Sequence, residues 1–203
     1  MKKQLFFLVV LVFLPLLVWS AGTLDVSLGY GIPGDHHMTV NDSIDVDLGT
    51  AGNMCFSAEY IMDLPWYDGL FGGVGVSYQG AIDMDEEGGD PACAFIPVYL
   101  QGGYKYPLSE NTCVRGLINL GFDFLNGNED YFEEDPSGGF YAGIGAGFEF
   151  NERFFLDAIF NYYTGSHEVK IDDYEDDYTI NYDISQSVIV IRLGIKIPEH
   201  WEW

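Results

Sequence analysis

The feature that most constrains the fold of this chain is a two-residue alternation of apolar and polar side chains that recurs along most of its length. It is clearest near the C-terminus, where one set of alternate positions reads Ile189, Ile191, Leu193, Ile195, Ile197 and the other reads Val190, Arg192, Gly194, Lys196. Successive side chains of a β-strand point to opposite faces, so this segment has an isoleucine-rich face and a face with two cations. No segment of residues 21–203 has helical periodicity, and the pattern therefore predicts an all-β fold.

Eight alternating segments can be read along the chain, at residues 24–30, 54–64, 70–82, 96–106, 114–124, 140–150, 156–163 and 185–197. They are joined in turn by long acidic segments (31–53, 83–93, 125–139 and 165–184) and by short turns (65–69, 107–112 and 151–153). Because neighbouring strands run antiparallel, the long segments are expected at one end and the turns and both termini at the other. We predict one domain, an eight-stranded antiparallel up-and-down transmembrane β-barrel, for the reasons given below.

Residues 1–20 have the composition of a secretory signal peptide. Lys2 and Lys3 precede an apolar run at residues 5–18, and small residues follow at Ser20 and Ala21. This order predicts cleavage near Ser20 or Ala21, which leaves residues 21–203 as the barrel domain. An uncleaved signal anchor is the alternative, but the run is shorter than the roughly 20 residues of a membrane span and contains Pro15.

The charge of the chain is strongly one-sided. It has 32 acidic residues against eight lysines and arginines, two of which lie in the predicted signal, and its formal net charge is −24. Nucleic acid is excluded as a partner because nothing in this composition would neutralise phosphates. The 14 tyrosines and 15 phenylalanines argue against a disordered, merely solvated chain.

The three cysteines, Cys55, Cys93 and Cys113, are an odd number for an exported chain. Cys93 and Cys113 begin consecutive antiparallel strands at opposite ends, which places them beyond disulfide range. A bridge between Cys55 and Cys93 stays open from the sequence. Otherwise we interpret the three as packing residues.

Alternation alone leaves open whether the apolar face points inward, as in a lipocalin-like soluble barrel, or outward to lipid. The apolar faces carry no charge, whereas the opposite faces hold glycines, acids and four of the six cations outside the signal. Cations placed beside acids indicate an enclosed polar interior rather than a solvated surface. The apolar runs are about ten residues long, enough for a tilted strand to cross a bilayer, and aromatic residues gather at their ends. The apolar face is therefore predicted to contact lipid.

In its export signal, eight alternating strands, short turns, long loops and terminal aromatic residue, the chain resembles the small eight-stranded outer-membrane barrels of the OmpA-barrel, OmpX and OmpW class. The resemblance covers residues 21–203. It implies a location in the outer membrane of a Gram-negative-type bacterium, with both termini periplasmic and outer-membrane lipid around the barrel. It also implies that barrel-assembly machinery recognises Trp201 and Trp203. Pro198 and Glu199 depart from the family, in which the aromatic residue directly ends the last strand.

The charged residues on the polar faces are candidates for an ion-pair network inside the barrel. Eight strands leave an interior that side chains can fill. Pairing of neighbouring strands places Arg115 near Glu149. It also places Asp157 near Arg192 and Lys196. We expect ion pairs that plug the lumen, because a buried unpaired charge is very costly; the alternative is a gated ion path. The expected lumen network comprises Glu59, Lys105, Arg115, Asp123, Glu149, Asp157, Arg192 and Lys196.

The four long segments contain most of the acidic residues and one cation, Lys170. They could bind cations, host proteins or other surface partners outside the cell, or form only a solvated, repulsive rim. Residues 83–88 resemble the start of an EF-hand loop, but Ala94 stands where the bidentate acid is required. No metal site or cofactor is otherwise expected. The candidate cation ligands are Asp83, Asp85, Glu87, Asp172, Asp173, Glu175, Asp176 and Asp177.

Some barrels of the resembled class modify lipid A, and an acyl-transfer or hydrolytic site needs a nucleophile, a histidine and an acid together. Ser166, His167 and Glu168 supply these residue types. Neighbours in a strand point to opposite faces, so the three cannot form one triad. His36 and His37 are interpreted as loop residues, and no enzymatic activity is expected.

The sequence thus predicts a monomeric, porin-like outer-membrane barrel with a structural or surface-interaction role, acidic extracellular loops and a plugged lumen. Two other functions remain open. The first is a narrow channel or small-molecule carrier, which the resemblance to OmpW-like proteins allows. The second, more remote, is a lipid-A-modifying barrel enzyme.

Overall fold

The computed structural model describes residues 22–40, 44–48, 52–80, 94–126, 137–172 and 177–198, so the predicted signal peptide lies outside the described residues. Within the described ranges, no helix is long and apolar enough to cross a membrane. The described residues form nine strands: β1 (Gly22–Val40), β2 (Ile44–Leu48), β3 (Asn53–Asp63), β4 (Leu70–Gln79), β5 (Ala94–Ser109), β6 (Thr112–Asn126), β7 (Ser137–Phe150), β8 (Phe154–Asp172) and β9 (Asp177–Pro198).

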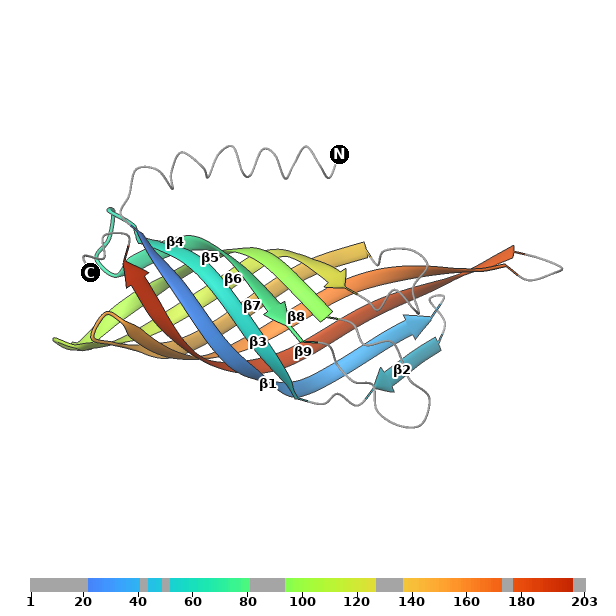
Figure 1. The fold of residues 1–203 in the computed structure, drawn as a ribbon, viewed down its shortest axis with the longest axis horizontal. Coiled ribbons are helices and arrows are strands. Elements are labelled where there is room, and N and C mark those ends of the chain that lie inside the picture. Colours follow the sequence, from blue (N-terminus) through green and yellow to red (C-terminus); the bar gives the residue numbers. More distant parts are fainter. Residues whose placement is uncertain are drawn as a thin grey trace.

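Eight of these strands form a closed antiparallel barrel (Figure 1). Neighbours pair in the order β1-β3-β4-β5-β6-β7-β8-β9, and β9 pairs back to β1. The closing ladder begins at Thr23 opposite Pro198 and continues to Pro33 opposite Val188. The predicted fold class, an eight-stranded antiparallel up-and-down barrel, is confirmed.

Two short hairpins and one turn of medium length join strands at one end of the barrel, which we call the turn end. Residues 64–69 join β3 to β4, residues 110–111 join β5 to β6, and residues 151–153 join β7 to β8. The first residues of β1 and the last of β9 lie at this end as well (Figure 1). The opposite end, which we call the loop end, carries the long connections, as the sequence predicted.

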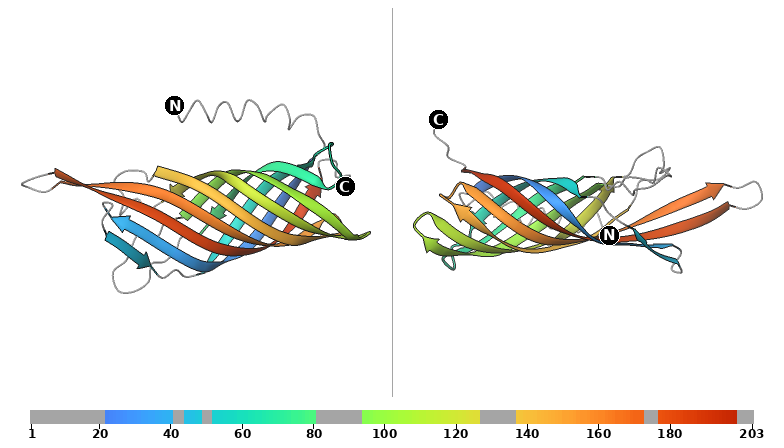
Figure 2. Two further views of the ribbon diagram at one scale, coloured as in Figure 1. Left: turned by 180° about the vertical axis from the view of Figure 1, so that it is seen from behind. Right: turned by 90° about the horizontal axis from the view of Figure 1, so that it is seen from below.

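The structure differs from the sequence prediction in four strands that continue past the rim of the barrel at the loop end. Residues 31–40 and 44–48, predicted as loop, form the upper part of β1 and the short strand β2. Most of the predicted acidic loop at 165–184 is strand too, because β8 and β9 stay paired as far as Asp172 opposite Asp177. Figure 2 shows this long hairpin leaving the barrel wall. We call the four-stranded sheet β2-β1-β9-β8 beyond the rim the extension sheet.

Residues 31–48 and 165–184 were predicted as loops because they contain many acidic residues. In residues 165–184, β-branched and aromatic residues alternate with polar ones, and the register places Val169 opposite Ile180 and Ile171 opposite Tyr178. Such residues favour strands, and this preference persists among acids when a partner strand is available.

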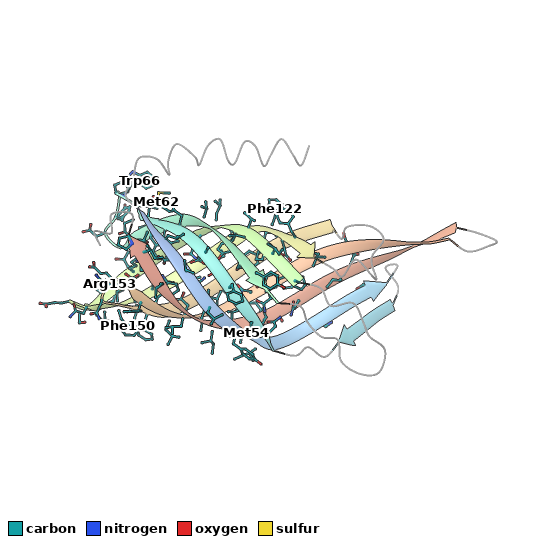
Figure 3. The ribbon with its side chains drawn as sticks, in the orientation of Figure 1. Met54, Met62, Trp66, Phe122, Phe150 and Arg153 are labelled. Atoms are coloured by element: carbon teal, nitrogen blue, oxygen red, sulfur yellow. The ribbon has the colours of Figure 1, made fainter. Side chains whose placement is uncertain are left out.

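The two faces of the barrel wall have opposite chemistry. Large apolar side chains on the outward face of every barrel strand are exposed, from Leu24 on β1 to Ile195 on β9. Figure 3 shows this belt between Met54 and Phe122 towards the loop end and Met62, Trp66 and Phe150 at the turn end. The prediction that the apolar face points outward is confirmed, and the belt has the form that a bilayer requires.

The inward face also carries apolar and aromatic side chains, although ion pairs were expected to fill the interior. They form two buried clusters. One contains Ile61, Phe71, Leu117 and Ile159. The other contains Cys55, Phe95, Tyr99, Leu125, Tyr141, Tyr163, Ile184, Val188 and Val190.

Two residues of the β7–β8 turn have left-handed backbone angles, which strain most side chains other than asparagine. Asn151 and Glu152 have φ values of 52° and 56°, and Arg153 N donates to Phe150 O at 3.0 Å, as in a two-residue hairpin turn. Asparagine tolerates this left-handed region, whereas for glutamate it costs about 1 kcal/mol. We expect Glu152→Gly to raise the free energy of unfolding by about 1 kcal/mol, measured by urea unfolding in phosphocholine micelles.

The matched control for this variant is Glu110→Gly in the β5–β6 turn. Among the described non-glycine residues, only Asn151 and Glu152 have positive φ, so Glu110 is unstrained. Its replacement by glycine should be neutral or slightly destabilising, because glycine makes the unfolded chain more flexible. Equal effects of the two variants would contradict the strain at Glu152.

Candidate functional site in the barrel lumen

The centre of the lumen holds five buried charged residues from five strands: Asp25 (β1), Glu59 (β3), Arg115 (β6), Asp157 (β8) and Arg192 (β9). Each is at most 3% exposed. All five occupy positions that alternate with the lipid-facing apolar residues of their strands. Their side chains therefore point into the barrel. We call this group the central network.

Asp157 is the residue that joins the two arginines of the central network. Arg115 Nε donates to Asp157 Oδ1 at 2.8 Å, and Arg115 Nη2 lies 2.5 Å from Asp157 Oδ2. Arg192 Nε donates to the same Oδ2 at 2.9 Å. One carboxylate therefore accepts three hydrogen bonds from two guanidinium groups, a charge-assisted arrangement among the strongest that side chains form.

Each arginine also contacts a second carboxylate, two strands away for Arg192 and on the opposite side of the barrel for Arg115. Arg192 Nη1 and Nη2 donate to the Glu59 carboxylate at 2.5 and 3.1 Å. Arg115 Nη1 lies 3.4 Å from Asp25 Oδ2. Since Asp25 and Glu59 are direct partners across the β1–β3 ladder, the central network connects β6, β8 and β9 with β1 and β3.

The sequence placed Arg115 near Glu149, but Arg115 contacts Asp157 instead. Arg115, Gly147 and Asp157 lie in one row across β6, β7 and β8. Because Gly147 has no side chain, the arginine reaches past β7 to the next strand. The sequence prediction paired only strands that are adjacent in the chain, so it could not identify this contact.

A second charged group lies at the turn end of the lumen. Lys196 Nζ lies 3.0 Å from Glu149 Oε1, rather than near Asp157 as strand pairing suggested. Lys105 Nζ lies 2.9 Å from Asp63 Oδ1 and 4.0 Å from Glu149 Oε2. Asp63 is largely exposed, whereas Glu149 and Lys196 are buried, so this group runs from the rim into the barrel.

Uncharged polar residues, which the sequence analysis left unassigned, surround the central network. Tyr99 Oη donates to Glu59 Oε1 at 2.6 Å, across Gly75 of β4. Gln101 Nε2 donates to both Glu59 and Asn119, at 3.2 and 3.0 Å. The alternation in the sequence already placed these residues on the inward face. An amide or hydroxyl group at such a position was the signal that could have predicted these contacts. The Arg115 guanidinium also lies 4.0 Å from the centroid of the Phe155 ring.

Asp123 differs from the other predicted network residues. It is 1% exposed, yet it forms no ion pair within the described residues. Neither carboxylate oxygen of Asp123 accepts a hydrogen bond from a described side chain. The structure therefore does not bring Asp123 together with Arg115, Lys105 or the other lumen cations.

The candidate cation ligands are only partly covered by the described residues. Asp83, Asp85, Glu87, Asp173, Glu175 and Asp176 lie outside them, and so do the side chains of Asp172 and Asp177. No group of three or more His, Cys, Asp or Glu side chains among the described residues could hold a metal ion. Trp201 and Trp203, the predicted assembly signal, also lie outside the described residues.

The structure describes two of the three cysteines and the backbone of residues 166–168. Cys55 is free and buried, Cys113 is free and half-buried, and Cys93 lies outside the described residues. Ser166, His167 and Glu168 are consecutive residues of β8, although the side chains of the last two are not described.

Comparison with solved structures identifies the fold. AlkL, an outer-membrane protein studied in lipid bilayers, superposes with a TM-score of 0.53 over 91% of this chain and 94% of its own, at 10% identity. The outer-membrane protein OprG from Pseudomonas aeruginosa gives a TM-score of 0.50 over 88% of this chain and 97% of its own, at 12% identity. The chain has the fold of the small eight-stranded outer-membrane β-barrels.

At 10–12% identity, these likenesses show the fold alone, and a fold does not by itself specify a function. No protein-family model and no curated protein matches the sequence. The outer-membrane neighbours and the apolar belt of the barrel support an outer-membrane location.

Because Asp157 binds two buried arginines, replacing one of its carboxylate oxygens by an amide nitrogen should strongly lower the stability of the protein. Asp157→Asn keeps the shape of the side chain but removes the negative charge between two buried guanidinium groups. We expect the free energy of unfolding to fall by about 3–5 kcal/mol, the usual result of breaking a buried ion pair on one side. Urea unfolding of the refolded barrel in phosphocholine micelles would measure it.

Asp63→Asn is the matched control, because Asp63 pairs with Lys105 at the exposed rim. Its side chain is 75% exposed, and the loss should stay below about 1 kcal/mol. A loss for Asp157→Asn no larger than for Asp63→Asn would mean that the central network contributes little to stability.

Proposed function

We propose that this protein is an outer-membrane scaffold whose lumen is closed by ion pairs and whose extension sheet is a surface for interactions outside the cell. The observation that carries this proposal is the burial of the central network. Arg115, Asp157 and Arg192 are at most 3% exposed, so water has little access to the charges that would otherwise line a conducting path.

The contents of the lumen on either side of the central network support a closed barrel. Towards the loop end, the rings of Tyr99, Tyr141 and Tyr163 form a row of tilted contacts, with centroids 5.2 Å apart in each neighbouring pair. The Phe95 ring extends the row at 5.1 Å from Tyr163. Towards the turn end, Glu149 and Lys196 occupy the interior. Eight-stranded barrels have room for such side chains and little else.

The extension sheet supports the surface role. The upper part of β8, residues 167–172, pairs with β9 alone among the described strands, and β2 pairs with β1 alone. Unpaired strand edges are templates on which an extended segment of another protein can add as a further strand. The extension carries one lysine and several acids, which favours cationic partners: Asp35, Asp45, Asp47, Glu168, Asp172, Asp177 and Asp183.

The remaining parts of the proposal rest on the resemblance to small outer-membrane barrels. The termini would lie in the periplasm and the extension sheet outside, the barrel would be a monomer, and the assembly machinery would recognise the C-terminal aromatic residues. The role is non-enzymatic: Ser166, His167 and Glu168 are consecutive in a strand, where successive side chains point to opposite faces.

A narrow channel is the second candidate. The observation that favours it is the excess of acids over cations on inward positions, since Asp123 has no ion-pair partner within the described residues. A cation path would need to pass the central network, which would then act as a gate.

Planar-bilayer recording separates the two candidates. Purified wild-type protein should give no steady conductance, because the charges of the central network are paired and shielded from water. The same preparation should show the heat-modifiable gel shift of a folded barrel, so that a silent membrane cannot be attributed to misfolding. Large, steady conductance would exclude the closed lumen and favour the channel.

Removal of the hairpin tip tests the surface role. Replacing residues 168–181 by Asn-Gly should leave barrel folding intact, since these residues pair with each other above the rim. It should strongly reduce the binding of a fluorescent oligolysine peptide, measured by anisotropy at low salt, because acids and a strand edge are lost together. A deletion within residues 83–91 is the matched control, because it removes acids without removing a described strand. Equal loss of binding in the two variants would contradict a specific role of the extension sheet.

A further inference from the structure

The outer wall of the barrel carries a shallow cavity at the loop end, apart from the lumen. It has a volume of about 320 Å³ and is lined by residues of β1, β7, β8 and β9. Sites for small molecules usually measure about 300–1,000 Å³, so this cavity is large enough for one compact ligand. Its lining residues on β8 and β9 lie where β7 stops pairing with β8 and the extension sheet begins.

One wall of the cavity is backbone without side chains. The β7–β8 register shifts between Gly138 and Tyr141, which marks a bulge. A side chain at Gly138 would collide with the backbone of Asp123, and one at Gly139 with the backbone of Thr164. Only glycine allows β7 to approach both neighbours this closely, so Gly138 and Gly139 contribute backbone alone to the cavity wall.

The remaining described lining is rich in hydroxyl groups. Thr39, Thr164, Ser166 and Ser185 line the cavity together with the carboxylate of Asp183. Thr164 Oγ1 accepts a hydrogen bond from Phe140 N at 2.8 Å and donates one to Phe140 O at 3.3 Å, so this hydroxyl fixes the bulge beside the cavity. Hydroxyls can donate and accept, and a carboxylate accepts strongly, so the wall can match a ligand with many hydroxyl groups.

The cavity adjoins the aromatic border of the lipid-facing belt. Phe140 follows the two glycines on β7, and Tyr162 precedes Thr164 on the same face of β8; they are 49% and 40% exposed. Exposed aromatic side chains mark the level of the bilayer interface in such barrels. A ligand in the cavity would therefore meet polar groups above and aromatic groups below.

We propose that this cavity binds a sugar ring that is uncharged or carries an amino group. The serine hydroxyls would bind the ring hydroxyls and Asp183 would bind an ammonium group. Phe140 and Tyr162, next to the lining residues Gly139 and Thr164 along β7 and β8, would border the apolar face of the ring. Few directed polar groups beside an aromatic surface are the usual composition of a small-molecule site. Because the cavity adjoins the bilayer interface, the ring can be free or the headgroup of a glycolipid.

A phosphorylated sugar is a poor ligand for the same cavity. None of the nine described lining residues is lysine or arginine, and Asp183 would repel an anion. The net charge of −24 adds long-range repulsion of anions. The proposed order of affinity is therefore glucosamine, then glucose, then glucosamine 6-phosphate.

Saturation-transfer NMR on the full barrel in deuterated phosphocholine micelles tests this order with these three probes at millimolar concentration. Transfer to glucosamine should exceed transfer to glucose, and the phosphate should show almost none. Asp183→Asn should weaken glucosamine binding about tenfold, the effect of losing one charge-assisted hydrogen bond, and should leave glucose unchanged.

Ser185→Leu should abolish transfer to both sugars by filling the cavity. Thr112→Leu is its matched control, since Thr112 is an outward hydroxyl residue at the turn end of β6 and should have no effect. The gel shift of the folded barrel should be the same for all variants.

A second measurement separates a free sugar from a lipid headgroup. Native mass spectrometry of the barrel from phosphatidylcholine nanodiscs containing a monoglucosyl diacylglycerol should show one retained glycolipid if the headgroup is the ligand, and Ser185→Leu should lose it. Binding of the free sugars without retained glycolipid would assign the site to soluble sugars. No transfer to any sugar and no retained glycolipid, or equal binding by wild type and Ser185→Leu, would overturn the proposal.

Discussion

The hydrogen-bonded ladder between β1 and β9 is the constraint on which the rest of the structure depends. In a bilayer, an unpaired strand edge would leave a row of backbone N–H and C=O groups without partners, at several kcal/mol each. Pairing of Leu24 with Ile197 and of Tyr30 with Ile191 removes that edge around the full circumference. Once the wall is closed, one face of every strand must contact lipid and the other must fill a narrow interior, and the two-residue alternation satisfies both demands.

The interior then requires that charges find partners across strands. Asp157 pairs with two arginines. Arg115 also reaches Asp25 on the far side of the barrel, and Arg192 also reaches Glu59, two strands away. Glycines in the same rows, such as Gly147 between Arg115 and Asp157, create the space in which long side chains cross a neighbouring strand. The glycine-rich inward faces and the long charged side chains are therefore two parts of one packing solution.

Most of the barrel was predictable because lipid and a narrow lumen impose a strict parity. The eight strands, their order, the outward apolar face and the segregation of turns and loops all follow from positions such as Leu24 and Ile195. Contacts beyond adjacent strands were not predictable: Arg115 finds Asp157 through a three-strand row, and Lys196 finds Glu149. The extension sheet was missed because its acids suggested a solvated loop, whereas pairs such as Val169 and Ile180 sustain a strand. The alternation placed Tyr141 and Tyr163 on the inward face, but it did not predict that aromatic side chains pack against each other in the lumen.

The pairing of the first strand with the last has a consequence for biogenesis. Thr23 and Pro198 are partners, so the contact that completes the wall joins nearly the first and the last of the described residues. Contacts of such long sequence separation form slowly and only after the whole chain is present. Until then the hairpins between adjacent strands can form, but two strand edges and the apolar belt remain exposed to water. A chain that ended before β9 could not close at all, and the complete chain depends on protection from aggregation during its passage to the membrane.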